Sequence, residues 1–338
     1  MCAARAWVFG AYFLFSTACS EEPFSVSQLS FDHSILSKDA TYLVFLGDTQ
    51  WYFSSDRESK YYKAALDWVC EAWEKGFDVA AVLNPGDVTN DNTLQEWRRF
   101  DKVMKEVGLS MPVLYSTGNH DYPALEQRSK ISERALPFFD HFISYHDSLV
   151  VARYGSGIDN VLFRIRIQGE PWLVLSLEFG PRKEVLNWAS EILDVYNKQP
   201  VVLLTHAYLF DEKDLYNSNS VSGFQDWAPK YTFSDAGDGL DIWENVVRGA
   251  PQVKMVLCGH NHFSAVVFSE NDFAMEVLQL RFDPSNQPNG GNGWLQLLEI
   301  SKPEAGADSG SLIRGWVYNP ILNQVMDDVA GNFEFIIK

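Results

Sequence analysis

Residues with metal-binding side chains follow several short apolar runs of this 338-residue chain. The runs have the composition of buried strands, and the residues at or just beyond their ends are Asp48, Asp87, Asn119, His206, His260 and His262. Because the carboxyl ends of neighbouring strands meet at one edge of an α/β sheet, we expect these side chains to converge on one site. Carboxylate, amide and imidazole ligands suit manganese, iron or zinc ions, whereas a structural zinc site usually takes cysteine.

Each of these residues alone is a weak signal, and their order along the chain makes the signal specific. A Gly-Asp pair after a strand is usually a turn, and a lone histidine is more often a hydrogen-bonded residue than a ligand. The tetrapeptides GNHD (118–121) and GHNH (259–262) are much rarer by chance. The other histidines, His33, His141 and His146, lie outside the series and are interpreted as structural.

Alternating strand and helix patterns position these residues. Short β-branched and aromatic runs predict strands at 41–46, 79–83, 113–116, 162–167, 172–177, 201–205 and 253–258. Apolar residues at helical spacing predict helices at 59–75, 94–107 and 183–196. A strand-rich end follows, with strands expected at 265–268, 275–280, 294–300, 312–318 and 333–337. This order predicts one α/β domain with mixed sheets over residues 40–338.

The charge balance limits the partners of the protein. Acidic side chains number 45 against 27 basic ones, which gives a net charge of -18 at pH 7. Such a charge repels polyphosphate backbones and anionic membrane surfaces, so general nucleic-acid binding is not expected. Phosphate chemistry on this chain would therefore depend on bound cations for its positive charge.

The first 18 residues have the pattern of a signal peptide. Arg5 is the single charged residue among the first 20, and an apolar run over 6–15 precedes small residues at 16–18. The run is too short to span a bilayer permanently. Two alternatives fit: ordinary cleavage after Ala18, or cleavage before a lipid-modified Cys19 as in a lipoprotein. The protein is thus expected to be periplasmic, secreted or anchored by lipid, with 19–39 as a polar tether.

The ordered series of candidate ligands resembles the motifs of the calcineurin-like metallophosphoesterase family, which run D-x-H, GD, GNH[DE], H and GHxH. It extends from Asp48 to His262, and its first block, GDTQ, is similar to that of an exported branch that carries Gln there. The resemblance implies an αββα sandwich, in which two stacked mixed β-sheets are flanked by helices.

The resemblance also implies a binuclear metal site. One ion would be held by Asp48, Gln50, Asp87 and His262, and the other by Asp87, Asn119, His206 and His260. A hydroxide bridging the ions would attack the phosphorus. His120 would protonate the leaving group as general acid, with Asp121 as its candidate orienting partner. Two residues depart from the family pattern, because Gln50 replaces a usual His and Asn90 replaces a frequent Asp.

Three functions remain open from the sequence. The first is hydrolysis of small-molecule phosphate esters outside the cytoplasm. The second uses the same core as a phosphodiesterase on nucleotides or phospholipid headgroups. The third is a catalytically weakened metal-binding protein, with one site impaired by Gln50. The aromatic-rich segment 208–243 is interpreted either as part of the substrate wall or as a packed surface loop.

Overall fold

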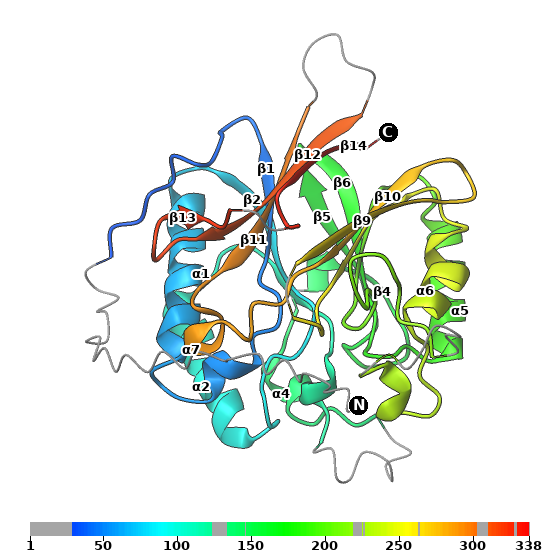
Figure 1. The fold of residues 1–338 in the computed structure, drawn as a ribbon, viewed down its shortest axis with the longest axis horizontal. Coiled ribbons are helices and arrows are strands. Elements are labelled where there is room, and N and C mark those ends of the chain that lie inside the picture. Colours follow the sequence, from blue (N-terminus) through cyan, green and yellow to red (C-terminus); the bar gives the residue numbers. More distant parts are fainter. Residues whose placement is uncertain are drawn as a thin grey trace, which may run out of the picture.

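Two β-sheets form the centre of the molecule (Figure 1). The computed structural model describes residues 29–338 except 124–133, 146, 219–224, 226, 263, 303–309, 328–329 and 338. The predicted signal peptide and Cys19 therefore lie outside the described residues. The first sheet has the order β13 (Gln324–Val325), β12 (Ser311–Asn319), β11 (Leu295–Ser301), β1 (Thr41–Phe45), β2 (Asp78–Asn84) and β3 (Val113–Tyr115), with β14 (Phe333–Ile337) paired to β12. The second has the order β4 (Val150–Arg153), β5 (Val161–Ile167), β6 (Glu170–Ser176), β7 (Val201–Leu204), β8 (Val253–Cys258), β10 (Glu276–Arg281) and β9 (Ala265–Glu270).

The strands that carry the candidate ligands are parallel to one another within each sheet. In the first sheet β2 pairs in parallel with both β1 and β3. In the second sheet β8 pairs in parallel with both β7 and β10. The carboxyl ends of these strands consequently lie at a common edge of each sheet, which is where α/β folds assemble their sites.

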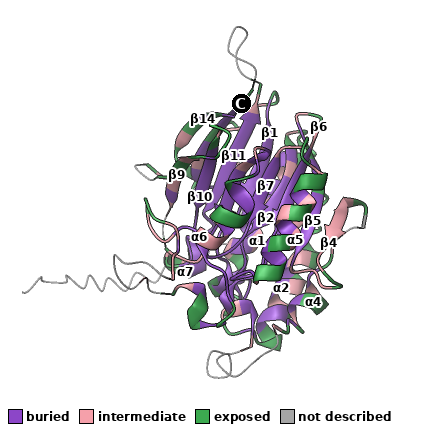
Figure 2. Cartoon of the chain, turned by 90° about the vertical axis from the view of Figure 1, so that its right-hand side faces the viewer, coloured by how far each residue is buried: buried purple, intermediate pink, exposed green. Residues whose placement is uncertain are grey.

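The two sheets stack face to face, and helices cover their outer faces. Side chains such as Phe45 of β1 and Leu204 of β7 share one apolar cluster between the sheets. Helices α1 (Ser59–Glu74) and α2 (Leu94–Val107) pack on the first sheet, and α5 (Lys183–Val195) and α6 (Gly239–Ile242) on the second. Figure 2 shows the central strands of both sheets buried, whereas β4, β9 and β14 are partly exposed, as are the outer faces of the helices. The predicted sandwich of two mixed sheets with flanking helices is confirmed.

Short elements complete the described part of the chain. The other helical elements there are α4 (Phe139–Phe142), α7 (Pro288–Gly291), a π-helical turn η6 (Trp243–Val247), and 3-10 turns η2 (Gln50–Phe53), η3 (Asn119–Asp121), η4 (Asp147–Leu149) and η5 (Pro229–Tyr231). None of the helices in the described ranges is both long and apolar enough to cross a membrane.

Local sequence signals explain the boundaries of helix α2. At its start, Thr93 accepts the backbone N–H of Glu96, and the Glu96 carboxylate accepts the N–H of Thr93 in return. At its end, Gly108 takes a left-handed conformation with φ 62°. The apolar residues Trp97 and Phe100 are buried against the first sheet. The predicted range 94–107 agrees with the observed one.

Residues 29–39, interpreted from the sequence as part of a polar tether, lie against helix α1. The ring of His33 stacks on that of Trp68 with centroids 5.0 Å apart, and its Nε2 lies 3.0 Å from the Trp68 carbonyl oxygen. Trp68 Nε1 donates to the Asp32 carbonyl oxygen at 2.8 Å. This part of the segment therefore belongs to the packed structure, and His33 has the structural role expected of it.

Candidate metal centre

Asp48, Asp87 and His206 form a compact buried group. One potential ligand atom from each lies within 4.8 Å of the others, and no more than 2% of any of the three residues is exposed. Asp48 and Asp87 follow β1 and β2 of the first sheet, whereas His206 follows β7 of the second. The group thus lies where the ligand-bearing edges of the two sheets meet.

Asn119 extends this group. Its Oδ1 lies 3.0 Å from His206 Nε2, and the same nitrogen is 3.4 Å from Asp87 Oδ2. The other ring nitrogen of His206 lies 3.1 Å from the Pro85 carbonyl oxygen, which fixes the plane of the imidazole. A carboxylate oxygen, an amide oxygen and an imidazole nitrogen therefore face one another, a donor set suited to a divalent transition metal.

Two glycines allow the carboxylates to approach the backbone of neighbouring loops. A Cβ atom at Gly118 would lie 2.0 Å from Asp87 Oδ1, and one at Gly259 would lie 1.9 Å from Asp48 Oδ1. Any side chain at these positions would displace a candidate ligand. The first residue of GNHD and of GHNH is therefore glycine for a steric reason, since a larger residue would collide with a carboxylate.

Asp121 connects the two loops that carry Asp87 and Asn119. Its carboxylate is fully buried and accepts the backbone N–H groups of Gly118 at 2.8 Å, Asp87 at 2.9 Å and Val88 at 2.9 Å. These contacts give Asp121 a positioning function for the ligand loops. Its assignment as the orienting partner of His120 stays a prediction.

His120 is half-buried at the edge of the group. Its backbone N–H donates to Asp87 Oδ1 at 2.8 Å, and its Nδ1 lies 2.5 Å from the carbonyl oxygen of Asn90. The backbone of Asn90 therefore orients the imidazole, although the side chain differs from the frequent family residue. This arrangement leaves Nε2 as the ring nitrogen that can exchange a proton with a substrate.

His260 lies next to His206, with ring centroids 4.8 Å apart. Its backbone N–H donates to Asp48 Oδ2 at 3.0 Å, and its Nε2 lies 2.8 Å from the carbonyl oxygen of Trp227. Burial, together with repulsion from a charged His206, lowers the pKa of His260 to about 3. A neutral imidazole of this kind is the form that binds metals.

Gln50 and His262 occupy different environments. Gln50 is buried, and its Oε1 has no hydrogen-bond partner among the described residues, so this oxygen is free to coordinate a cation. The side chain of His262 is 55% exposed, and its Nδ1 lies 3.2 Å from Asp283 Oδ2. His262 is outside the compact group of ligand atoms, and the ligand roles of both residues stay predictions.

Asp283 is a residue of this site that the sequence reasoning did not find. It is 2% exposed, follows strand β10, and its charge acts on Asp48, His206 and His260. It meets the criterion applied to the other candidates, since it stands just after an apolar strand. The following Pro284 gives the dipeptide the pattern of an ordinary turn, which conceals the signal.

Buried negative charge at the centre is incompletely balanced by the protein itself. Burial first, then Asp283 and Asp87, raises the pKa of Asp48 well above the usual carboxyl value. Burial and Asp87 raise the pKa of Asp121 to about 7. Burial favours a raised pKa at Asp87 as well, but the adjacent His206 and His120 lower it overall. Such a cluster fits bound cations, which would compensate the carboxylates.

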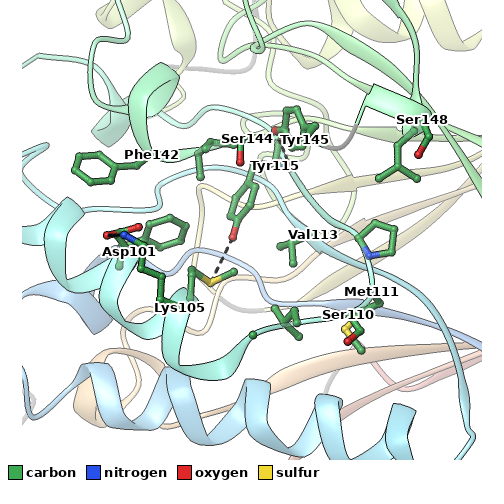
Figure 3. A pocket seen from close by; sticks show the side chains of 17 residues that line it. Asp101, Lys105, Ser110, Met111, Val113, Tyr115, Phe142, Ser144, Tyr145 and Ser148 are labelled. Carbon is green, nitrogen blue, oxygen red and sulfur yellow. Dashed lines mark hydrogen bonds and ion pairs between the residues drawn. The ribbon is translucent and has the colours of Figure 1, made fainter.

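A separate cavity of about 620 Å³ lies on the outer side of β3 (Figure 3). Its lining is mostly apolar, and Tyr115 donates there to Met104 Sδ at 4.0 Å. Asp101 and Lys105, four residues apart on α2, form an ion pair on this lining. No candidate metal ligand is among its lining residues, so the chemistry is assigned to the buried Asp-Asp-His group instead.

Stacked mixed sheets and flanking helices define an α/β sandwich, and the buried Asp-Asp-His group in it could hold a metal ion. The model of the calcineurin-like phosphoesterase family matches residues 41–264, and the chain belongs to that family. This is a family of metal-dependent phosphoester hydrolases whose members typically bind two metal ions. The family resemblance expected from the motifs is confirmed.

A curated relative supports the assignment at a greater distance. The chain is 24% identical over 276 residues to the uncharacterized protein YvnB of Bacillus subtilis (strain 168). The aligned part covers 79% of this chain and 19% of that protein. The chain thus spans about a fifth of the length of this relative.

Removal of metal is expected to lower the melting temperature more at about pH 7.5 than at about pH 5. The raised pKa values mean that folded Asp48 and Asp121 keep protons that the unfolded chain, with carboxyl pKa values near 4, has lost. The contribution of both groups to stability is therefore complete below about pH 4 and is lost as pH rises, and for Asp121 this loss runs through about pH 7. Desolvation opposes the charged form of His206, but Asp87 raises its pKa overall, which acts in the same direction.

Calorimetric melting with and without a chelator at both pH values measures this effect. The lowered pKa of Asp87 gives stability that is present above about pH 4 and is retained at both values. An equal effect of the chelator on the melting temperature at the two pH values would contradict the inference that bound cations compensate the buried carboxylates.

Proposed function

We propose that this protein hydrolyses phosphate esters of small molecules at a binuclear metal centre. The observation that carries the proposal is the compact group of Asp48, Asp87 and His206, which Asn119 extends. The negative charge of this group is not fully compensated by the protein. When bound, manganese, iron or zinc ions supply positive charge for the phosphoryl oxygens and acidify a water molecule. The signal-peptide pattern of the first 18 residues supports action outside the cytoplasm.

The protein's own residues would hold the ions and move one proton. Asp87, which the family resemblance assigns to both candidate ligand sets, has one oxygen near His206 Nε2 and the other bonded to the His120 N–H. His120 is held through Nδ1 by the Asn90 carbonyl, so its Nε2 would donate a proton to the leaving oxygen.

The test uses metal-stripped protein reloaded separately with manganese, iron or zinc. p-Nitrophenyl phosphate and bis(p-nitrophenyl) phosphate serve as monoester and diester substrates. We expect metal-dependent release of p-nitrophenol, and the preferred substrate assigns monoesterase or diesterase activity. No release with any metal, together with less than one bound ion per chain, would favour a weakened metal-binding protein.

His120→Asn is expected to lower kcat by about 10²–10⁴-fold on alkyl phosphate esters, whose leaving alkoxide needs a proton. The loss should be much smaller on p-nitrophenyl esters, because p-nitrophenolate leaves without protonation. Metal content, measured by atomic absorption, should stay unchanged. His141→Asn, a change at an exposed histidine of α4, is the matched control. Equal losses of kcat on both kinds of ester would show that His120 is not the general acid.

A further inference from the structure

Aromatic side chains surround His260 on the side of the metal centre. The buried ring of Phe179 lies 5.7 Å from the rings of both His206 and His260. The buried ring of Tyr216 lies 5.5 Å from His260. These contacts shield the imidazoles from water and are explained by packing alone.

The aromatic surface continues outward to two exposed residues, Trp227 and Tyr231, named here the outer aromatic pair. Their rings lie 5.8 Å apart at an interplanar angle of 82°. Tyr231 is 6.5 Å from Phe179, and the carbonyl oxygen of Trp227 lies 2.8 Å from His260 Nε2. The outer aromatic pair thus contacts Phe179 through Tyr231 and the candidate ligand His260 through the backbone of Trp227.

Burial in the fold does not explain why residue 227 is a tryptophan. It is 60% exposed, so most of its apolar area remains in water. Its backbone has φ 65°, in the left-handed region that bulky residues rarely adopt. The carbonyl contact with His260 needs no particular side chain, and glycine would adopt this conformation without strain. A large exposed ring at such a position indicates a binding role.

We propose that the outer aromatic pair binds a flat π-electron group of the phosphate ester other than its leaving group, either an aryl ring or a nucleobase. This inference rests on the proposed function and gives its substrate class. A ring stacked on Trp227 could contact the edge or face of Tyr231, because the two rings are nearly perpendicular. The segment 208–243 would thereby contribute to the substrate wall through these two residues.

The experiment compares Trp227→Gly with the unchanged protein on three diesters that share the p-nitrophenolate leaving group. These are methyl p-nitrophenyl phosphate, bis(p-nitrophenyl) phosphate and thymidine 5′-(p-nitrophenyl phosphate). Glycine keeps the backbone carbonyl and suits the positive φ, so the melting temperature should change little. Trp73→Ala, which removes a 44% exposed tryptophan from α1, is the control.

We expect Trp227→Gly to lower kcat/KM about tenfold on a diester with a second flat group, the typical value of one stacking contact. The methyl diester should change by less than about twofold, and Trp73→Ala should change none of the three. Loss on the thymidine diester alone assigns a nucleobase, and loss on both aromatic diesters assigns any flat ring. Equal losses on all three diesters, or no loss on any, would overturn the proposal.

A binding measurement separates this proposal from the proposed function. Calorimetric titration with thymidine 5′-monophosphate is carried out on both proteins, and weaker binding to Trp227→Gly supports the outer aromatic pair even if neither protein turns over. Turnover by the unchanged protein with identical binding to both proteins would leave the phosphoesterase function intact and reject the aromatic subsite.

Discussion

Asp87→Asn is expected to reduce turnover by about three orders of magnitude and to lower the metal content. The change keeps the shape of the side chain but removes the charge of a residue that we propose is shared by both candidate ligand sets and has one oxygen 3.4 Å from His206 Nε2. Metal ions supply several kcal/mol of charge stabilisation in such sites, and about 4 kcal/mol corresponds to about 10³ in rate. Steady-state kinetics and metal analysis of the purified variant measure both effects.

The control for this change is Asp56→Asn, since Asp56 has a side chain that is 81% exposed and pairs with Arg99. It should keep full turnover and full metal content. An Asp87→Asn protein that is folded, binds two ions and turns over at the original rate would exclude Asp87 as a metal ligand.

Asp121→Ala is expected to lower the free energy of unfolding by about 3 kcal/mol. The change leaves three buried backbone N–H groups, those of Gly118, Asp87 and Val88, without their acceptor. Each such loss costs about 1–3 kcal/mol, and the losses are not fully additive. Urea unfolding of metal-free protein measures the change without interference from metal binding.

Asp121→Asn is the matched variant, because its amide oxygen can still accept one or two of these bonds. It should lose about half as much stability as the alanine variant. If both variants unfold at the urea concentration of the original protein, Asp121 does not hold the ligand loops together.

The regular elements near the site could be predicted because their sequence patterns agree with their burial. Helix α2 combines a capping pair, a buried apolar face and a C-terminal glycine, and its predicted range is the observed one. Strands β1, β2 and β8 are mostly apolar and mostly buried, as expected for strands covered on both faces. Strand β4 was not predicted, since its four residues are all half-buried and show no alternation.

The candidate site could be predicted only in part. The rule that ligands follow apolar strands brings Asp48, Asp87 and His206 together, as observed. It omits Asp283, whose Asp-Pro sequence has the pattern of a turn, although it lies buried beside the others. The rule also does not predict in which direction each side chain points. The exposed position of His262 could therefore not be anticipated from the GHNH motif. Orientation depends on loop packing between distant segments, which sequence spacing does not encode.

The origin of the ligands from both sheets has a consequence for when the centre can form during synthesis. Asp48 and His260, which share a hydrogen bond, are 212 positions apart in the chain. At about 5–20 residues per second, roughly 10–40 s separate the synthesis of the first residue from that of the second. A nascent chain therefore cannot complete the candidate metal centre until its second sheet exists. If the protein is exported before it folds, the ions it acquires are those of the compartment it enters, not of the compartment where it was made.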